Sequence, residues 1–539
     1  FEIHDIGAVQ VNGGGEFGSS GDSLNKWHHV VWCRDSTSMR FYVNGILKKT
    51  IVNASYNPNY STDRQLTIGS DTLVDSTLDG FITDVRIVKG QALYGNTFTP
   101  PAHPLSSTHY TLDGTDPTIS STKQTISGSV SLLLQPGKTT SISEVAVKSE
   151  KHFKTVIWTG DGSNPRNIPL GFNADFVWIK ARNQSYNYTL FDSVRGFGKK
   201  HLFSDLTSGE SANEYGHVSG VSNNNITVAA GASGDTYVNN SSTTYVGWLW
   251  RAGGTPSADD KGVVDGVEQT ITGNAKLDAG TLTPTRMSVN TKAGFSIVTY
   301  SIPSSTSAND FTIPHGLSKT PEVVIVKNTV QPGHSGSQMW CVYHHSEPTK
   351  AGFLNRFIAF STASLQENFN NSLPTSQVFT VGHPSNNNSG DTCRDGNSYV
   401  AYAWHSVPGY SAFGSYVANG STDGPFIHTG FRPAWVMIKN TNSSSDYSSW
   451  MIVDSTRSAF NPSGGGNCLW ANNNSSEGYR GNGSAAVGNY DVLDIDFLSN
   501  GFKMRGGGHN TETNDAYSSA KVYIYMAFAE QPFTRNRAR

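Results

Sequence analysis

Three stretches of the chain carry the same order of apolar and polar positions. Each contains an uninterrupted apolar run that follows a glycine and ends in Lys180, Lys327 or Lys439. An unbroken run such as residues 323–326 is typical of a strand that is covered on both faces. One aromatic strand precedes each run, and another follows it after a variable stretch. The pattern therefore predicts one β-domain that occurs three times.

The flanking strands fix the limits of the three copies. The closing strands are rich in Tyr and Trp and lie at residues 245–250, 399–404 and 523–528. We expect repeat domains at residues 152–254, 293–409 and 410–539, the last with a C-terminal tail, and a linker at residues 255–292. The Asn-, Ser- and Gly-rich stretches between the shared strands differ among the copies, so recognition is expected there.

The start of the chain follows a different pattern. Residues 27–33 are mostly apolar, and Phe41 and Val43 alternate with polar neighbours, which is the period of a half-buried strand. The pair Asn44-Gly45 marks a tight hairpin turn. The first hundred residues are therefore also expected to be β-structure.

Composition supports an all-β chain built of tandem β-sandwich domains. Its 539 residues exceed the length of roughly 250–300 at which single cores stop growing. Charged residues make up 15%, against about 25% in typical domains, whereas the turn formers Gly and Asn are abundant. A net charge of −3 without a basic stripe argues against nucleic-acid binding. The chain also has no run of about 18 apolar residues, so no membrane insertion is expected.

Residues 20–101 resemble the second half of a laminin-G-like or concanavalin-A-like jelly roll, in the motifs W-H-H-V-V and L-D-G-F-I-T-D-V-R-I-V-K-G. The resemblance implies a partial β-sandwich at residues 1–108. Its missing half is expected either upstream of residue 1 or from another chain that covers the open face. Residues 109–151 are expected to form a small β linker.

The repeated domain resembles a β-domain of predicted tail-fibre and appendage proteins of tailed bacteriophages, particularly marine ones. The matching residues are 295–300, 409–416, 424–434, 496–503 and 527–533. The resemblance implies a virion protein, assembled in the host cytoplasm, with other tail or capsid proteins as partners. Such fibres are commonly homotrimers, since three chains bury edges and faces that one leaves open. No molecular activity follows from the resemblance.

Several polar motifs could carry metal or catalytic chemistry. Carboxylates at Asp491, Asp494 and Asp496 could bind Ca²⁺, but an acidic and apolar alternation also suits an ordinary strand, which we favour. The adjacent pairs His28-His29 and His344-His345 suit zinc poorly, because neighbouring strand residues face opposite sides. The four cysteines are scattered and are expected to be small buried hydrophobes: Cys33, Cys341, Cys393 and Cys468. No metal or cofactor is predicted.

Two copies share the motif Asp-Ser-x-Arg, at Asp192–Arg195 and Asp454–Arg457. An acid with a cationic clamp could be catalytic. A turn fixed by an Asp–Arg pair is the favoured interpretation, because no nucleophile or base recurs beside the motif. No catalytic residue is therefore predicted.

Aromatic residues are the remaining binding chemistry. Tyr186, Tyr188, Trp470 and Tyr479 lie in polar, loop-like surroundings, where they could stack on sugars or anchor an interface. Tryptophans within strands are expected in the core: Trp158, Trp178, Trp248, Trp250, Trp404 and Trp435.

Together the threefold array, the resemblance to phage appendage domains and the missing catalytic constellation lead us to expect a structural protein of a bacteriophage virion, a tail fibre or surface appendage that recognises host-surface glycan and is not an enzyme. Two alternatives stay open. One is a polysaccharide depolymerase, which would need paired carboxylates in a groove. The other is a purely architectural protein that decorates the capsid or tail.

Overall fold

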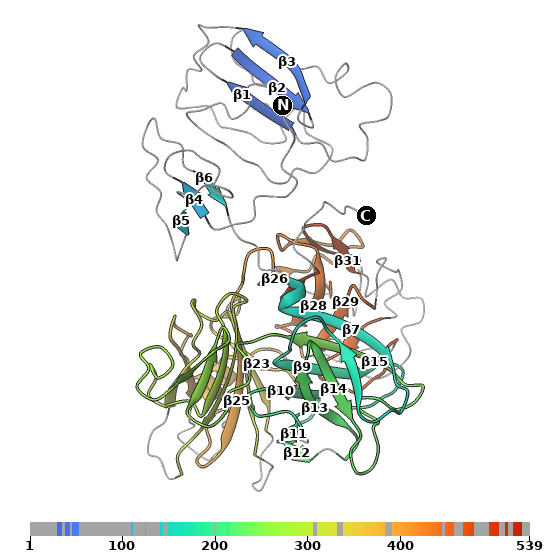
Figure 1. Ribbon diagram of the computed structural model, residues 1–539, viewed down its shortest axis with the longest axis vertical. Helices are drawn as coiled ribbons and strands as arrows, with labels where there is room; N and C mark the ends of the chain where they lie inside the picture. The colour runs from blue at the N-terminus through green and yellow to red at the C-terminus, as the bar shows by residue number, and fades with distance from the viewer. Residues whose placement is uncertain are drawn as a thin grey trace. The chain divides into compact units, whose positions relative to one another are not determined.

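A computed structural model describes residues 149–530 with internal gaps, together with six short strands before them. The gaps are residues 199, 213, 305–309, 331–337, 383–390, 445–447, 458–466, 479–494, 506–512 and 516–520. The chain divides into two compact units, and the second comprises Val147–Pro532 (Figure 1).

The N-terminal unit contains two small antiparallel sheets. Strands β1 (Val30–Arg34), β2 (Ser38–Val43) and β3 (Ile46–Val52) form the first. Val43 pairs with Ile46, which confirms the hairpin predicted at that point. The second sheet has the order β5-β4-β6, with strands Gln124–Thr125, His109–Thr111 and Ser141–Ser143. The strands predicted between residues 53 and 108 lie outside the described residues.

The second unit is nearly all β, as predicted, and each repeat has a main sheet with one shared strand order. The opening strand pairs with the closing strand, the closing strand with the lysine-ended strand, and the latter with a fourth strand. In repeat 1 these are β7 (Phe153–Thr159), β15 (Thr244–Trp250), β9 (Phe176–Ala181) and β10 (Thr189–Asp192). In repeat 2 they are β19 (Phe295–Ser301), β25 (Ser398–Trp404), β21 (Val323–Asn328) and β22 (Trp340–His344). In repeat 3 they are β26 (Ser411–Val417), β33 (Val522–Ala529), β28 (Pro433–Asn440) and β29 (Met451–Asp454).

A smaller sheet covers one face of each main sheet, so each repeat is a β-sandwich. Repeat 1 has β8 (Arg166–Pro169), β13 (His217–Ser222) and β14 (Asn225–Ala229), with the short pair β11 (Lys200–His201) and β12 (Ser211–Ala212). Repeat 2 has β20 (Asp310–Pro314) and β24 (Val378–Gly382), and repeat 3 has β27 (Phe426–His428), β31 (Ile495–Leu498) and β32 (Gly501–Met504). Two main sheets gain a further strand, β23 (Ala351–Phe353) or β30 (Leu469–Trp470).

Residues 255–292, expected to be a linker, are instead part of the main sheet of repeat 2. They contain β16 (Lys261–Val264), β17 (Val267–Thr270) and β18 (Arg286–Asn290), and β18 pairs with the outer edge of β19. Asp265 and Gly266 both have positive φ and join β16 to β17 as a two-residue hairpin, the geometry that an Asp-Gly pair favours.

The unit also contains a helix, α1 (Thr362–Phe369), whose N-terminus is capped by the Ser361 side chain accepting from the Ser364 N–H. A 3₁₀ turn, η1 (Ser149–Lys151), precedes β7. Among the described residues no helix is long and apolar enough to cross a membrane.

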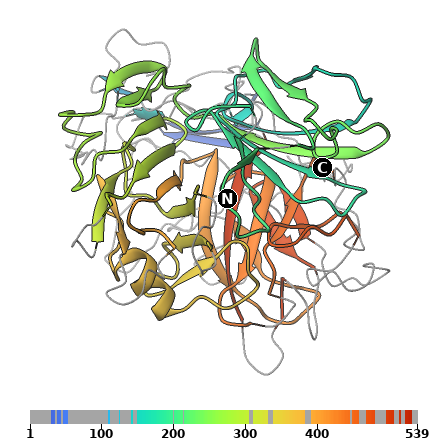
Figure 2. The same ribbon diagram turned by 90° about the horizontal axis from the view of Figure 1, so that it is seen from below.

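The lysine-ended strand of each main sheet is buried on both faces, which explains the unbroken apolar runs. In repeat 1, Val177 and Ile179 face the core of their own sandwich, whereas Phe176 and Trp178 join a core shared with the other two repeats. Repeat 2 divides in the same way, with Val324 in its own core and Val323 in the shared one. Figure 2 shows the three repeats lying around a common centre.

Backbone hydrogen bonds close the three repeats into a ring. The N–H groups of Glu210, Phe360 and Glu477 donate to the carbonyls of Thr329, Thr441 and Arg182, over 2.8–2.9 Å. These bonds join repeat 1 to 2, repeat 2 to 3, and repeat 3 to 1. Each acceptor lies two residues after the strand lysine, so one contact recurs three times. Head-to-tail contacts of this kind close a ring when the rotation permits.

Candidate functional site

The Asp-Ser-x-Arg motifs form turns locked by buried ion pairs, as predicted. Arg195 Nε donates to Asp192 Oδ2 over 2.5 Å, and Arg457 Nε donates to Asp454 Oδ2 over the same distance. The other carboxylate oxygen accepts backbone N–H groups within the turn, including those of the two arginines. All four side chains are at most 3% exposed.

The aspartate of each turn also accepts a hydrogen bond from a side chain of a neighbouring repeat. Tyr402 of repeat 2 donates its hydroxyl to Asp192 Oδ2 over 2.8 Å, and Trp248 of repeat 1 donates its indole N–H to Asp454 Oδ2 over 3.0 Å. Repeat 2 has His344 in the position of the aspartates, and its Nε2 lies 3.2 Å from the Tyr525 carbonyl of repeat 3. The three positions therefore serve the three boundaries between repeats.

Glutamates extend this network toward the surface. Arg195 Nη1 pairs with Glu210 over 3.0 Å, and Glu477 receives both Arg457 Nη1 and Arg182 Nε over 2.8 Å. Burial opposes ionisation of Glu477, but the two arginines hold its pKa below the usual value. The charged groups of the network are thus paired with one another rather than presented to a substrate.

The three strand lysines are fully buried beside the same boundaries. Lys327 Nζ donates to Thr207 O of repeat 1 over 2.9 Å, and Lys439 Nζ donates to Phe357 O of repeat 2 over 3.1 Å. Lys180 Nζ donates to carbonyls of its own repeat. Burial lowers the pKa of each lysine to about 7. These lysines bridge backbone segments, and nothing in their arrangement forms a nucleophile with a base.

Replacing Tyr402 with phenylalanine is expected to lower the free energy of unfolding by about 1.5–3 kcal/mol, because a bond to an ionised, buried carboxylate is lost. Urea unfolding followed by tryptophan fluorescence measures the change. Tyr410→Phe is the matched control, since Tyr410 is equally buried and its hydroxyl has no hydrogen-bond partner among the described residues. Its unfolding midpoint should stay or rise, and equal losses in both variants would contradict the structural role of the Asp192 bond.

The predicted metal candidates do not assemble in the part of the chain that the structure describes. Asp496 pairs with Arg505 over 2.5 Å, whereas Asp491, Asp494 and the His28-His29 pair lie outside the described residues. His345 Nε2 lies 3.1 Å from the Phe413 carbonyl. Within the described ranges no group of three or more His, Cys, Asp or Glu side chains could hold a metal.

The predictions for aromatic and sulfur side chains have mixed outcomes. The six strand tryptophans are buried, at 8% exposed or less, as are Cys341, Cys393 and Cys468. The expectation of surface stacking is wrong for Tyr188 and Trp470, which are both 0% exposed. Tyr188 immediately precedes β10, and Trp470 pairs with Met451 in the sheet of repeat 3. Tyr479 and the Cys33 side chain lie outside the described residues.

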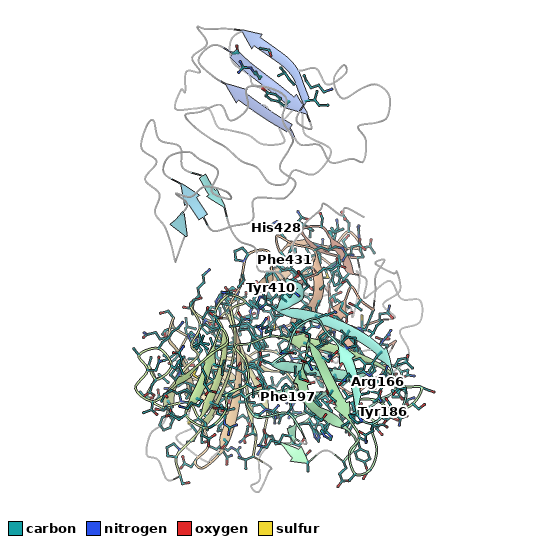
Figure 3. The ribbon with its side chains drawn as sticks, viewed as in Figure 1. Arg166, Tyr186, Phe197, Tyr410, His428 and Phe431 are labelled. Carbon is teal, nitrogen blue, oxygen red and sulfur yellow. The ribbon has the colours of Figure 1, made fainter. Side chains whose placement is uncertain are left out.

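Tyr186 remains partly exposed and belongs to a group that we call the tyrosine cluster, formed by Tyr186, Tyr215 and Tyr237. The Tyr237 ring lies 6.4 Å from the ring of Tyr186 and 5.9 Å from that of Tyr215, at interplanar angles of 85° and 79°. In Figure 3, Tyr186 lies at the periphery of repeat 1, whereas Tyr410 lies toward the opposite end of the unit.

Three loops at one end of the repeat 1 sandwich bring the tyrosine cluster together. They follow β9, precede β13 and follow β14. The pairing of His217 with Ala229 places the last two loops at one end of their sheet, and the contact between the Tyr186 and Tyr237 rings joins the first loop to them. The Tyr237 N–H donates to the Tyr215 carbonyl over 3.0 Å. Gly216 has φ +98°, and a Cβ there would meet Val238 Cγ2 at 2.7 Å, so the close approach of the two loops requires glycine.

Sequence inspection missed Tyr215 and Tyr237, because they are separated from Tyr186 by about thirty and fifty positions. The available signal was the Glu-Tyr-Gly sequence at residues 214–216. A glycine directly after an aromatic loop residue marks a backbone turn that could present the ring.

Comparison with known proteins identifies two matches. Residues 6–93 match a family model described as the concanavalin A-like lectin/glucanases superfamily, which supports the jelly-roll resemblance of the N-terminal segment. Residues 148–532 match a family model described as a domain of unknown function, DUF7483. Searches of curated proteins and of solved structures found no match.

Proposed function

The chain belongs to the DUF7483 family through residues 148–532, and we propose that it is a structural protein of a bacteriophage particle, a tail fibre or other surface appendage that attaches to host-surface glycan. In this proposal the protein is located in the virion, has other tail or capsid proteins as partners, and acts by binding. The family description itself assigns no role.

The closed ring of repeats is the observation that carries the proposal. The strands shared by the repeats and the Asp192 and Asp454 turns are used to hold the repeats together. The segments that differ among repeats connect these strands, and those of their residues that lie outside the shared core can change without loss of the ring. A rigid body with variable connecting loops suits repeated attachment to a surface better than it suits one conserved reaction.

The N-terminal segment adds a second line of support, since the description of the superfamily that it matches names lectins as well as glucanases. A homotrimer remains part of the proposal, but faces of the three main sheets already pack against one another within one chain. Trimerisation would therefore use other surfaces of the molecule.

Immunogold labelling of purified phage particles tests the location. Antibodies against the chain should label the tail or another projection of particles from the phage that encodes it. Particles without label, from lysates in which the chain is detected, would overturn the proposal. Because the matched superfamily includes glucanases, release of oligosaccharides from host polysaccharide by the purified chain would favour the depolymerase alternative.

A further inference from the structure

We infer that the tyrosine cluster, together with Asn187 and Asn474, is a binding subsite for a neutral pyranose unit of a surface polysaccharide. The inference rests on the proposed attachment function and names a site and a ligand class for it. It combines exposed aromatic rings, hydrogen-bonding amides and an acidic setting at one place.

The first argument is the arrangement of the rings. Tyr215 is 45% exposed, and Tyr186 and Tyr237 are partly exposed. The rings of Tyr186 and Tyr215 each stand nearly perpendicular to that of Tyr237, so the cluster offers ring faces in more than one direction. Pyranoses carry flat patches of C–H groups, which are attracted to the electron-rich faces of aromatic rings.

The second argument is that buried side chains of repeat 1 support the rings of the cluster. Tyr237 contacts the ring of Phe203 at 5.6 Å, and Phe203 contacts His201 at 4.3 Å, with both supporting side chains buried. His201 Nε2 lies 3.0 Å from the Ser211 hydroxyl. With the tight approach at Gly216, these contacts order the rings before a ligand arrives, which reduces the entropy lost on binding.

The third argument is the polar rim. Asn474 of repeat 3 donates through Nδ2 to Asn187 Oδ1 of repeat 1 over 3.4 Å, and Asn187 directly follows Tyr186 of the cluster in the sequence. Asparagine amides carry donors and acceptors on one planar group, which matches the paired hydroxyls of a sugar. Since the two amides come from different repeats, the rim exists only when the ring of repeats is closed.

The charges near the cluster select against anionic sugars. Glu214 is exposed beside Tyr215 and accepts from the Ser233 hydroxyl over 3.3 Å. Asp205 is buried and accepts from the Tyr188 N–H, and burial raises the pKa of its carboxyl to about 7, so Glu214 is the carboxylate that a ligand meets. Uronates would bring a second negative charge to this setting, whereas neutral hexoses would not.

Saturation-transfer-difference NMR on the full chain tests the inference. The probes are neutral β-glucan and mannan oligosaccharides, with oligogalacturonate and alginate oligosaccharides as anionic counterparts. We expect transfer to at least one neutral probe and weaker transfer to the anionic ones. Tyr215→Ala and Tyr186→Ala should each weaken binding by roughly tenfold, as expected for the loss of one aromatic contact.

Phe426→Ala is the matched control, because Phe426 is also 45% exposed but lies on β27 of repeat 3, outside the cluster. Its affinity for the neutral probe should equal that of the parent, and the unfolding midpoints should show that all variants fold. Binding that survives both tyrosine substitutions, or no transfer to any neutral probe, would overturn the subsite. The proposed attachment function would then still be judged separately by the immunogold labelling.

Discussion

Replacing Arg457 with methionine is expected to lower the free energy of unfolding of the repeat unit by about 3–5 kcal/mol. Methionine keeps the aliphatic length but leaves Asp454, which is fully buried, without its cation. The same change removes the guanidinium that lies 5.5 Å from the Trp248 ring and that pairs with Glu477. Breaking one side of a buried pair is costly because the remaining charge has lost its water as well as its partner.

Urea unfolding at pH 7 measures this loss, and Arg286→Met provides the control. Arg286 pairs with Asp259 over 2.6 Å, but the two side chains are 32% and 72% exposed. An exposed pair contributes at most about 1 kcal/mol. Similar losses in the two variants would show that the Asp454 turn does not depend on its buried pair. Replacing Asp454 and Arg457 together by leucine and methionine should recover part of the stability, since no unpaired charge remains.

The strands could be predicted from sequence because their signal is local. The apolar run that contains Val323 and Val324 predicts that both faces of the strand are covered. Both side chains are indeed buried in the structure. The same run does not indicate which part of the protein covers each face of the strand. A second sheet and a neighbouring repeat are equally apolar, so the sequence is compatible with separate tandem sandwiches and with a closed ring. The structure distinguishes these two arrangements, because it places Val323 in the shared core and Val324 in the core of repeat 2.

The candidate site was predicted only in part, for a similar reason. Tyr186 and Tyr188 are two positions apart in one polar segment, yet Tyr188 is buried and Tyr186 is not. Tyr188 packs at 6.4 Å against the ring of Trp248, about sixty positions away, a long-range contact that no local pattern encodes. Polar neighbours therefore indicate a loop, but they do not indicate which of its aromatic residues faces water.

The His344 position shows how the ring tolerates change at one boundary. Asp192 and Asp454 each accept a hydrogen bond from an aromatic side chain of the next repeat. The corresponding residue of repeat 3 is Met526, which has no donor to offer, and His344 instead bonds the neighbouring Tyr525 carbonyl. Repeat 2 also has Glu347 where the other two motifs have arginine, so an aspartate at position 344 would be a buried charge with neither cation nor aromatic donor.

The strand lysines lead to the second large effect, a rise in stability between pH 7.5 and 8.5. Burial lowers the pKa of Lys180, Lys327 and Lys439 from 10.5 to about 7. Above pH 7 the folded chain has therefore released protons that the unfolded chain keeps until about pH 10.5. Folding in this range therefore releases protons, and a higher pH, which lowers the proton activity, favours the folded state. Each lysine contributes up to about 1.4 kcal/mol per pH unit, and the three together up to about 4 kcal/mol.

The chosen window separates the lysines from most other shifted groups. Burial holds the pKa of buried histidines such as His315 at about 4, and raises that of Asp391 to about 6, so both have finished titrating below pH 7.5. Burial also raises the pKa of Asp205 to about 7, so this carboxyl is mostly ionised at pH 7.5 and opposes the rise only weakly above it. Burial raises the pKa of Cys393 to about 12, so its opposing effect begins only near the usual thiol value of 9. Between these limits the slope of stability against pH reports mainly on the lysines.

Urea midpoints at pH 7.5, 8.0 and 8.5 measure the slope, and Lys439→Met should reduce it by about one third because one of three titrating lysines is gone. Lys319→Met, which changes an exposed lysine of repeat 2, should leave the slope unaltered. A flat profile in the parent protein would mean that the buried lysines stay protonated, held by carbonyls such as Thr207 O and Phe357 O. In that case the bridges between repeats are charged hydrogen bonds, and Lys439→Met would instead lower stability equally at every pH.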